Sequence, residues 1–301
     1  MKLPTPTFFR KNVSGRSEKV IWLILPTLAV LTFLFLGGFI FGFLQSLGFF
    51  SVLSDRKEQI GLSAYRMAFS SRPVRAGILL TFRVAFLSTI ISLVVALALS
   101  LMISRTKRMK SFMISLVQFN IPIPHVVAAT GILLTFSQSG IISRITYSLG
   151  MHHSTGDFPI ITNDPFGYGI ILSYLWKEIP FLTVLILSAL RGYVTLLDEA
   201  AKTLGAKYSY RLKRIILPYV FPSILSGTII VFAFSFGSYE VPYILGQPYP
   251  ATLPVVAYQF YTNRDLSFRP VSMALATVTS LVIAILVYFY MKLTQRERKG
   301  I

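Results

Sequence analysis

Two adjacent charged residues, Lys177 and Glu178, lie in the middle of a long apolar run and are the first candidates for chemistry. An ionisable side chain at membrane depth is costly, so it marks either a solute pathway or a paired structural site. Opposite charges beside Pro180 can stabilise a kink or pack against a partner subunit, and we favour that structural role over a pathway role. Asn120, which precedes two closely spaced prolines, is a further pathway candidate.

A third acidic candidate lies where a helix is expected to break. Glu240 follows the sequence Phe-Ser-Phe-Gly-Ser-Tyr239 and precedes Val241-Pro242. Proline removes a backbone donor and restricts the residue before it. Irregular backbone at membrane depth is tolerated where it is buried in protein or lines a cavity. Tyr239 and Glu240 are therefore predicted to line a translocation cavity, with Glu240 the best single candidate for contact with a solute or a gate.

The remaining reactive residue types indicate neither an enzyme nor a metal site. His125 follows Pro124 and is interpreted as a packed histidine, and the adjacent His152 and His153 cannot both face one site comfortably. The chain has no cysteine, no discernible nucleophile–base arrangement and no Gly-x-x-x-x-Gly-Lys-Ser/Thr phosphate loop. We therefore expect no metal, no cofactor and no ATP hydrolysis in this chain.

The elements that must position these residues are membrane-spanning helices. The 301 residues are 54% hydrophobic and only 13% charged, whereas soluble domains carry about 25% charged residues. Six apolar runs reach or approach the roughly 20 residues that cross a bilayer. They lie at about 20–47, 78–104, 112–136, 167–190, 219–237 and 270–291. The sequence thus predicts an all-α, polytopic membrane protein with six transmembrane helices.

The distribution of charge predicts the orientation. The formal net charge is +18, and most basic residues fall in four segments, namely 1–19, 105–111, 191–218 and 292–301. Lys and Arg accumulate on the cytoplasmic side of membrane proteins. We therefore predict an N-in/C-in topology, with cytoplasmic tails at 1–19 and 292–301 around a transmembrane domain at 20–291. Topology accounts for most of the positive charge, so a nucleic-acid partner is not required.

Two further patterns refine this arrangement. Small residues at four-residue spacing let another helix approach closely, and they occur in the first two apolar runs (Gly38 and Gly42; Ser88, Ser92, Ala96 and Ser100). The proline-rich stretch Val241–Tyr261 is predicted to be an outward-side loop with a short helix near Val255–Tyr261.

The longest predicted inner loop, residues 191–218, has the pattern of two short helices joined by a turn. Thr195 and Asp198 have the spacing of a capping box, Glu-Ala-Ala-Lys favours helix, and Gly205 is placed to end that helix with a positive φ. A second amphipathic turn follows, until Pro218 opens the next span. A compact helical hairpin of this kind is suited to docking on a soluble partner.

This loop resembles the EAA loop of permeases in binding-protein-dependent ABC importers. The sequence Glu199-Ala200-Ala201 is followed by three residues, Gly205, nine residues, and then Ile215-Ile-Leu217-Pro218, so every defining position matches. The resemblance extends over roughly residues 60–291, where Asn120-Ile-Pro-Ile-Pro and Trp176-Lys-Glu-Ile-Pro are similar to proline-marked segments of the family. It implies a type I importer permease fold in the bacterial inner membrane.

The resemblance also implies partners. Two permease subunits would form the pathway, an ABC ATPase dimer carrying ATP and Mg would bind below, and an extracytoplasmic binding protein would deliver the solute. In the family this loop is a coupling helix, so Glu199 would contact the ATPase, Gly205 would make the turn, and Ala200 and Ala201 would allow close approach. We expect the second permease to be a homologue, although a second copy of this chain stays open.

The sequence leaves two alternative functions to weigh, and it constrains the identity of the solute less than the fold. A secondary transporter predicts internal repeats, which are not visible, and a membrane scaffold or sensor subunit does not explain the charged, proline-broken spans. Sugar-type members often carry Asp-Gly-Ala where this chain has Leu204-Gly205-Ala206. That difference favours members handling polyamines, ferric iron, thiamine, phosphonates or inorganic anions over sugars.

Overall fold

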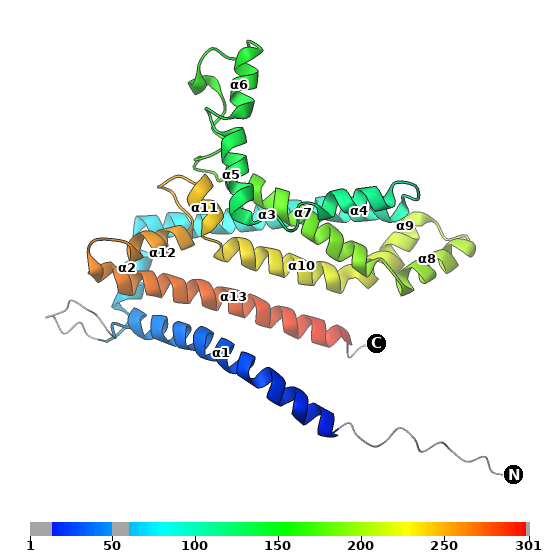
Figure 1. Cartoon of the computed structure of the whole chain (residues 1–301), viewed down its shortest axis with the longest axis horizontal. Coiled ribbons are helices and arrows are strands. Elements are labelled where there is room, and N and C mark those ends of the chain that lie inside the picture. Colours follow the sequence, from blue (N-terminus) through cyan, green and yellow to red (C-terminus); the bar gives the residue numbers. More distant parts are fainter. Residues whose placement is uncertain (1–13, 50–59, 299–301) are drawn as a thin grey trace.

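The computed structural model describes residues 14–49 and 60–298 as an assembly of helices (Figure 1), with no strand in these ranges. The long helices are α1 (Ser14–Ser46), α3 (Arg72–Arg105), α7 (Tyr168–Ala189), α10 (Leu217–Gly237) and α13 (Arg269–Arg298). The shorter helices are α2 (Ser63–Ser70), α4 (Lys110–Gln118), α5 (His125–Phe136), α6 (Ile141–Ser148), α8 (Tyr193–Thr203), α9 (Tyr208–Arg211), α11 (Glu240–Leu245) and α12 (Leu253–Tyr261). Three helical turns complete the list: η1 (Thr155–Asp157), η2 (Leu212–Ile216) and η3 (Leu266–Phe268).

The predicted all-α fold with six membrane-spanning helices is confirmed. Within the described ranges, six helical stretches are long and apolar enough to cross a bilayer, namely Trp22–Ser46, Arg72–Arg105, His125–Ser148, Tyr168–Ala189, Tyr208–Gly237 and Leu266–Phe289. Parts of the predicted tails, 1–13 and 299–301, lie outside the described residues, as does the 51–59 portion of the predicted first outer loop. The rest of both predicted tails is helical, because α1 begins at Ser14 and α13 continues to Arg298.

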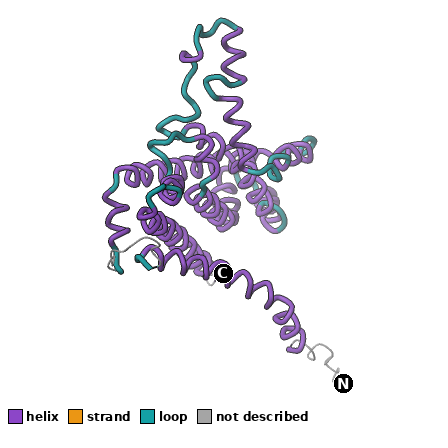
Figure 2. Tube along the Cα trace, turned by 60° about the vertical axis from the view of Figure 1, so that its left-hand side comes forward, coloured by secondary structure: helices purple, strands orange, loops and turns teal. Residues whose placement is uncertain are grey.

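The third predicted span, at 112–136, is wrong as a single helix. The chain turns at residues 119–124 between α4 and α5, because Pro122 and Pro124 lack the donors that a continuous helix needs. Figure 1 shows α4 lying along α3 and α7, whereas α5 and α6 turn away from the long helices. Figure 2 shows the same projection from a second direction.

Helix α3 contributes to all three buried clusters of the described core: it packs with α7 and α10, with α5, α7 and α11, and with α2, α12 and α13. The small residues predicted to allow close packing (Ser88, Ser92, Ala96 and Ser100) are all fully buried, so that prediction is confirmed. Ser100 Oγ donates to the carbonyl of Thr183 across the α3–α7 contact at 3.1 Å. On α10, a Cβ added at Gly227 would lie 2.7 Å from Leu182 of α7, so glycine permits that approach.

The corresponding prediction for α1 is supported at one position only. A Cβ added at Gly42 would lie 3.6 Å from the Met273 sulfur of α13, whereas a Cβ added at Gly38 would have nothing within 4 Å. Most α1 side chains are exposed and apolar, including Trp22 and Phe33. Such a surface is compatible with lipid contact along this helix.

The proline-rich stretch contains the predicted short helix, α12, and one additional helix, α11. One backbone amide of this stretch is satisfied by another helix, since Leu253 N donates to Thr81 Oγ1 of α3 at 2.7 Å. Gly77 makes this contact possible, because a Cβ there would lie 2.9 Å from the Ala251 carbonyl oxygen. Irregular backbone buried in this way is the arrangement that a membrane environment requires.

Candidate coupling loop and polar membrane core

The first helix of the 191–218 loop begins earlier than the sequence indicates. Gly192, with φ of +77°, makes the turn after α7, and α8 starts at Tyr193. The predicted capping box is therefore wrong. Thr195 lies inside the helix, and its hydroxyl donates to the Leu190 carbonyl at 2.9 Å.

The turn at Gly205 has the predicted geometry. Gly205 has φ of +80° and directly follows the end of α8. Its amide donates to the Lys202 carbonyl, and the next amide, of Ala206, donates to the Ala201 carbonyl, both at 3.0 Å. An L-residue with a side chain adopts this backbone region at a cost of about 1–2 kcal/mol, which explains the glycine.

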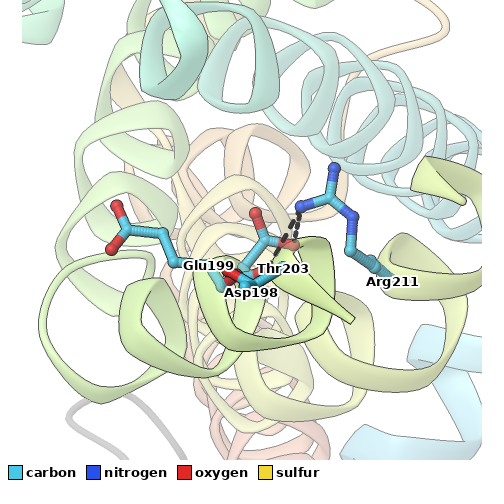
Figure 3. Close-up of polar contacts among 4 residues, drawn as sticks. All are labelled: Asp198, Glu199, Thr203 and Arg211. Atoms are coloured by element: carbon cyan, nitrogen blue, oxygen red, sulfur yellow. Dashed lines mark hydrogen bonds and ion pairs between the residues drawn. The ribbon is translucent and has the colours of Figure 1, made fainter. Parts of the chain in front are cut away.

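An ion pair holds the two halves of the hairpin together. Arg211 Nη1 of α9 lies 2.8 Å from Asp198 Oδ1 of α8, and it also donates to the Asp198 carbonyl at 3.2 Å. Figure 3 shows Arg211 pointing toward Asp198, whereas the Glu199 carboxylate points away from this pair. Arg211 is only 11% exposed, so the pair is largely shielded from solvent. Asp198 thus braces the hairpin, and Glu199 is left available.

The second half of the loop is continuous with the next span. Residues Tyr208–Gly237 form one helical stretch through α9, η2 and α10, so Pro218 lies inside the helix and does not open it. At η2 the amide of Leu217 donates five residues back, to Leu212. This π-type turn directly precedes Pro218, which supplies no donor, and such turns are frequent at functional sites.

The hairpin presents apolar side chains to its surroundings. Leu204 is 87% exposed, Leu196 64% and Tyr210 59%, and Glu199 and Ala200 are also exposed. Ala201 and Ile215 are half-buried, and so is Leu217. Exposed apolar residues gathered on one charged element indicate an interaction surface.

Lys177 and Asn120 hold the bend between α4 and α5. Lys177 Nζ donates to three carbonyls of the bend, those of Asn120 at 2.8 Å, Ile121 at 3.1 Å and Ile123 at 2.6 Å. The Asn120 side-chain amide donates in return to the Trp176 carbonyl of α7. The carbonyls freed by the proline-induced break are thereby satisfied, which supports the structural role favoured for Lys177.

Glu178 joins three helices. Its carboxylate accepts from Ser92 Oγ of α3 at 3.3 Å and from Ser235 Oγ of α10, while Glu178 itself belongs to α7. A neighbouring recess of about 190 Å³ is bordered by Lys177, Glu178, His125 and Phe234. The two charged residues therefore stabilise the core and also border an open space.

Tyr239 and Glu240 lie at the predicted helix break, between α10 and α11. Glu240 is exposed, and the Tyr239 ring centroid lies 5.1 Å from that of Tyr243 and 4.7 Å from that of Tyr258. Sequence reasoning missed this aromatic cluster, although the four-residue spacing of Tyr239 and Tyr243 was a signal for it.

The histidines are packed or locally bonded. The His125 ring lies 4.4 Å from that of Phe234, as the packing interpretation predicts. His152 Nε2 lies 2.8 Å from Thr146 Oγ1. Among the described residues, no three His, Cys, Asp or Glu side chains gather as a metal site would require.

The six long apolar helices, the polar groups buried between them and the exposed helical hairpin indicate a multi-pass membrane protein. The chain belongs to the binding-protein-dependent transport system inner membrane component family, which it matches over residues 17–300. It is therefore a multi-pass inner-membrane protein and the permease subunit of a binding-protein-dependent ABC importer. Membership in this family disfavours the secondary-transporter and scaffold alternatives.

Relatives and solved structures agree with this assignment. The chain is 28% identical to a probable molybdenum ABC transporter permease of Haloferax volcanii, covering 64% of this chain and 67% of the relative. It is 27% identical to the spermidine/putrescine permease PotC of Haemophilus influenzae, covering 72% and 74%. It is 23% identical to the trehalose/maltose permease MalF of Thermococcus litoralis, covering 80% and 82%.

The fold matches bacterial ABC transporter structures. A transporter that imports the acidic polysaccharide alginate aligns with a TM-score of 0.75 at 20% identity, covering 95% of this chain and 99% of that chain. The alginate transporter in complex with its alginate pentasaccharide-bound periplasmic protein aligns with a TM-score of 0.74 at 22% identity, covering 93% and 96%.

Proposed function

We propose that the 191–218 loop is the site where a separate ATPase drives this permease. The observation that carries the proposal is the exposed hairpin itself, which presents Leu196, Leu204 and Tyr210. The Glu199 carboxylate on the same hairpin points away from the Asp198–Arg211 pair. The match of Glu199-Ala200-Ala201, Gly205, Ile215, Leu217 and Pro218 to the coupling pattern supports it. ATP and Mg would then bind to the ATPase dimer, and this chain would carry no cofactor.

The arrangement of the helices supports an orientation. In Figure 1, the start of α1, the end of α13 and the α8–α9 hairpin all lie toward the same end of the molecule. If the hairpin meets an ATPase in the cytoplasm, both ends of the described chain face the cytoplasm too, which is the N-in/C-in topology.

The pathway is proposed to form between this chain and a second permease subunit, which we expect to be a homologue. Glu240 and Tyr239 at the α10–α11 break, together with the recess beside Lys177, Glu178 and Asn120, are the proposed pathway residues. An extracytoplasmic binding protein would deliver the solute. The named relatives handle molybdenum, polyamines and disaccharides, so we assign the choice of solute to the binding protein.

The test of ATPase coupling compares two glycines with the same backbone requirement. Gly205 has φ of +80° and Gly150 has φ of +72°, and a Cβ at either meets nothing within 4 Å. Gly205→Asp and Gly150→Asp therefore introduce similar local strain, but only Gly205 belongs to the loop. We expect Gly205→Asp to abolish uptake and ATPase co-purification with normal membrane insertion, and Gly150→Asp to retain both.

The readouts are solute uptake in cells, the amount of chain in the membrane, and the ATPase recovered with the tagged chain in mild detergent. Normal transport by Gly205→Asp would contradict the coupling assignment. Equal loss in both variants would attribute the effect to backbone strain and not to the loop.

A further inference from the structure

A large recess lies between the hairpin and the membrane core. Its volume is about 620 Å³, and it is bordered by the end of α3, the start of α4, the end of α7, and α8 and α9. Of the residues proposed to meet the ATPase, Glu199 lies at the edge of this recess, whereas none of Leu196, Leu204 and Tyr210 lines it.

The recess carries an excess of positive charge. Its charged lining comprises five cations and two carboxylates (Arg105, Lys110, Arg191, Lys202, Arg211, Asp198 and Glu199). Asp198 is neutralised by Arg211, and the Arg105 guanidinium lies 3.3 Å from the Tyr208 ring centroid. In the described part of the chain, Lys110, Arg191 and Lys202 form no ion pair. An anion is the ligand that such a surplus attracts.

Part of the lining of the recess is apolar. Leu101, Val194 and Ile216 belong to it, and Val194 and Ile216 are buried. Leu101 belongs to the last turns of the membrane-spanning helix α3, and Leu190 follows directly after the membrane-spanning helix α7. The recess therefore begins where two spans leave the hydrocarbon, at the depth of lipid headgroups.

We infer that this recess binds the phosphate group of an anionic phospholipid from the cytoplasmic leaflet. Basic pockets between transmembrane helices on the cytoplasmic side are suited to such headgroups. A free phosphate has the same anionic chemistry, but it makes no apolar contacts, whereas the glycerol and first acyl carbons of a lipid can contact the apolar part of the lining. The cytoplasmic location rests on the proposed function of the 191–218 loop.

The consequence is a lipid link between the coupling loop and the membrane core. Lys202 belongs to α8, Arg191 follows α7, and Arg105 and Lys110 flank the α3–α4 turn. One phosphate held among them would join the hairpin to two spans by charge alone. Transport would then depend on anionic lipid through this chain as well as through its partners.

The test uses the assembled importer purified in mild detergent from membranes that contain phosphatidylglycerol, with retained lipid measured by mass spectrometry. Basic residues near a membrane surface attract anionic lipid. The double variant Arg191→Gln/Lys202→Gln is therefore expected to bind phosphatidylglycerol about thirtyfold more weakly and to retain correspondingly less of it. Lys213→Gln/Arg214→Gln is the control, because it removes the same charge from exposed positions of the loop that do not line the recess.

Unchanged phosphatidylglycerol in the Arg191/Lys202 variant would overturn the inference. A second arm measures binding of radiolabelled inorganic phosphate to the delipidated complex, and saturable binding that the same variant abolishes, without a lipid difference, would overturn the lipid source. ATPase recovery is scored in the same preparations. Absence of the ATPase from every preparation, wild type included, would refute the proposed coupling function. A difference in retained phosphatidylglycerol between the two double variants would still support the lipid site in that case.

Discussion

Lys177→Met is expected to destabilise the chain by removing the donor for three carbonyls at once. A hydrogen bond to a charged group contributes about 1.5–3 kcal/mol in soluble proteins, but side-chain bonds inside membranes average about 0.6 kcal/mol. Three bonds of 2.6–3.1 Å to Asn120, Ile121 and Ile123 therefore stabilise the bend by roughly 2–4 kcal/mol. Methionine fills a similar volume, so the loss reflects the bonds and not a cavity.

The assay is thermal unfolding of the purified importer in one detergent. At about 2 °C for each kcal/mol in a large domain, the midpoint should fall by roughly 4–8 °C. Lys107→Met, at an exposed position, is the matched control and should leave the midpoint unchanged. If Lys177→Met melts with the control, the carbonyls find other partners and the argument that Lys177 holds the bend is refuted.

Two other residues give sharper local tests. Gly77→Ala places a Cβ 2.9 Å from the Ala251 carbonyl oxygen and should lower stability by about 1–3 kcal/mol. Gly131→Ala is the control, because its Cβ meets nothing within 4 Å, and it should be neutral. Equal melting temperatures for the two variants would contradict the close packing of α3 on the α11–α12 connection. Glu240→Gln should lower the uptake rate severalfold while the complex assembles normally, because a charge at the α10–α11 break is lost. Unchanged affinity and rate in that variant would remove Glu240 from the pathway.

The features predicted from sequence are those set by short-range patterns. Hydropathy over about 20 residues identifies spans, and four-residue spacing of small residues identified the face of α3 that packs on α7. The positive φ at Gly205 follows from the helix pattern before it. Each of these needs only the residues within one element, which is why they were predictable.

The features that sequence reasoning missed depend on contacts between distant segments. Asp198 was assigned to a cap with Thr195 three residues away, but it pairs with Arg211 across the turn, and this ion pair depends on how α8 folds against α9. The run at 112–136 satisfies hydropathy as a single span. It bends at Pro122 and Pro124, and the carbonyls that the bend leaves free accept hydrogen bonds from Lys177, more than 50 residues later in the sequence.

The continuity of the helix from Tyr208 to Gly237 connects the proposed coupling loop to the proposed pathway. At 1.5 Å per residue its 30 residues extend about 45 Å, from the Asp198–Arg211 brace to the break before Glu240. In the second half of this helix, Ser235 and Gly227 tie it to α7 through Glu178 and through direct packing against Leu182. A packed helix moves as a unit because interiors do not deform continuously. A displacement imposed on the hairpin by an ATPase would therefore reach the α10–α11 break through one helix, and the buried Glu178 contacts would make α3 and α7 follow it.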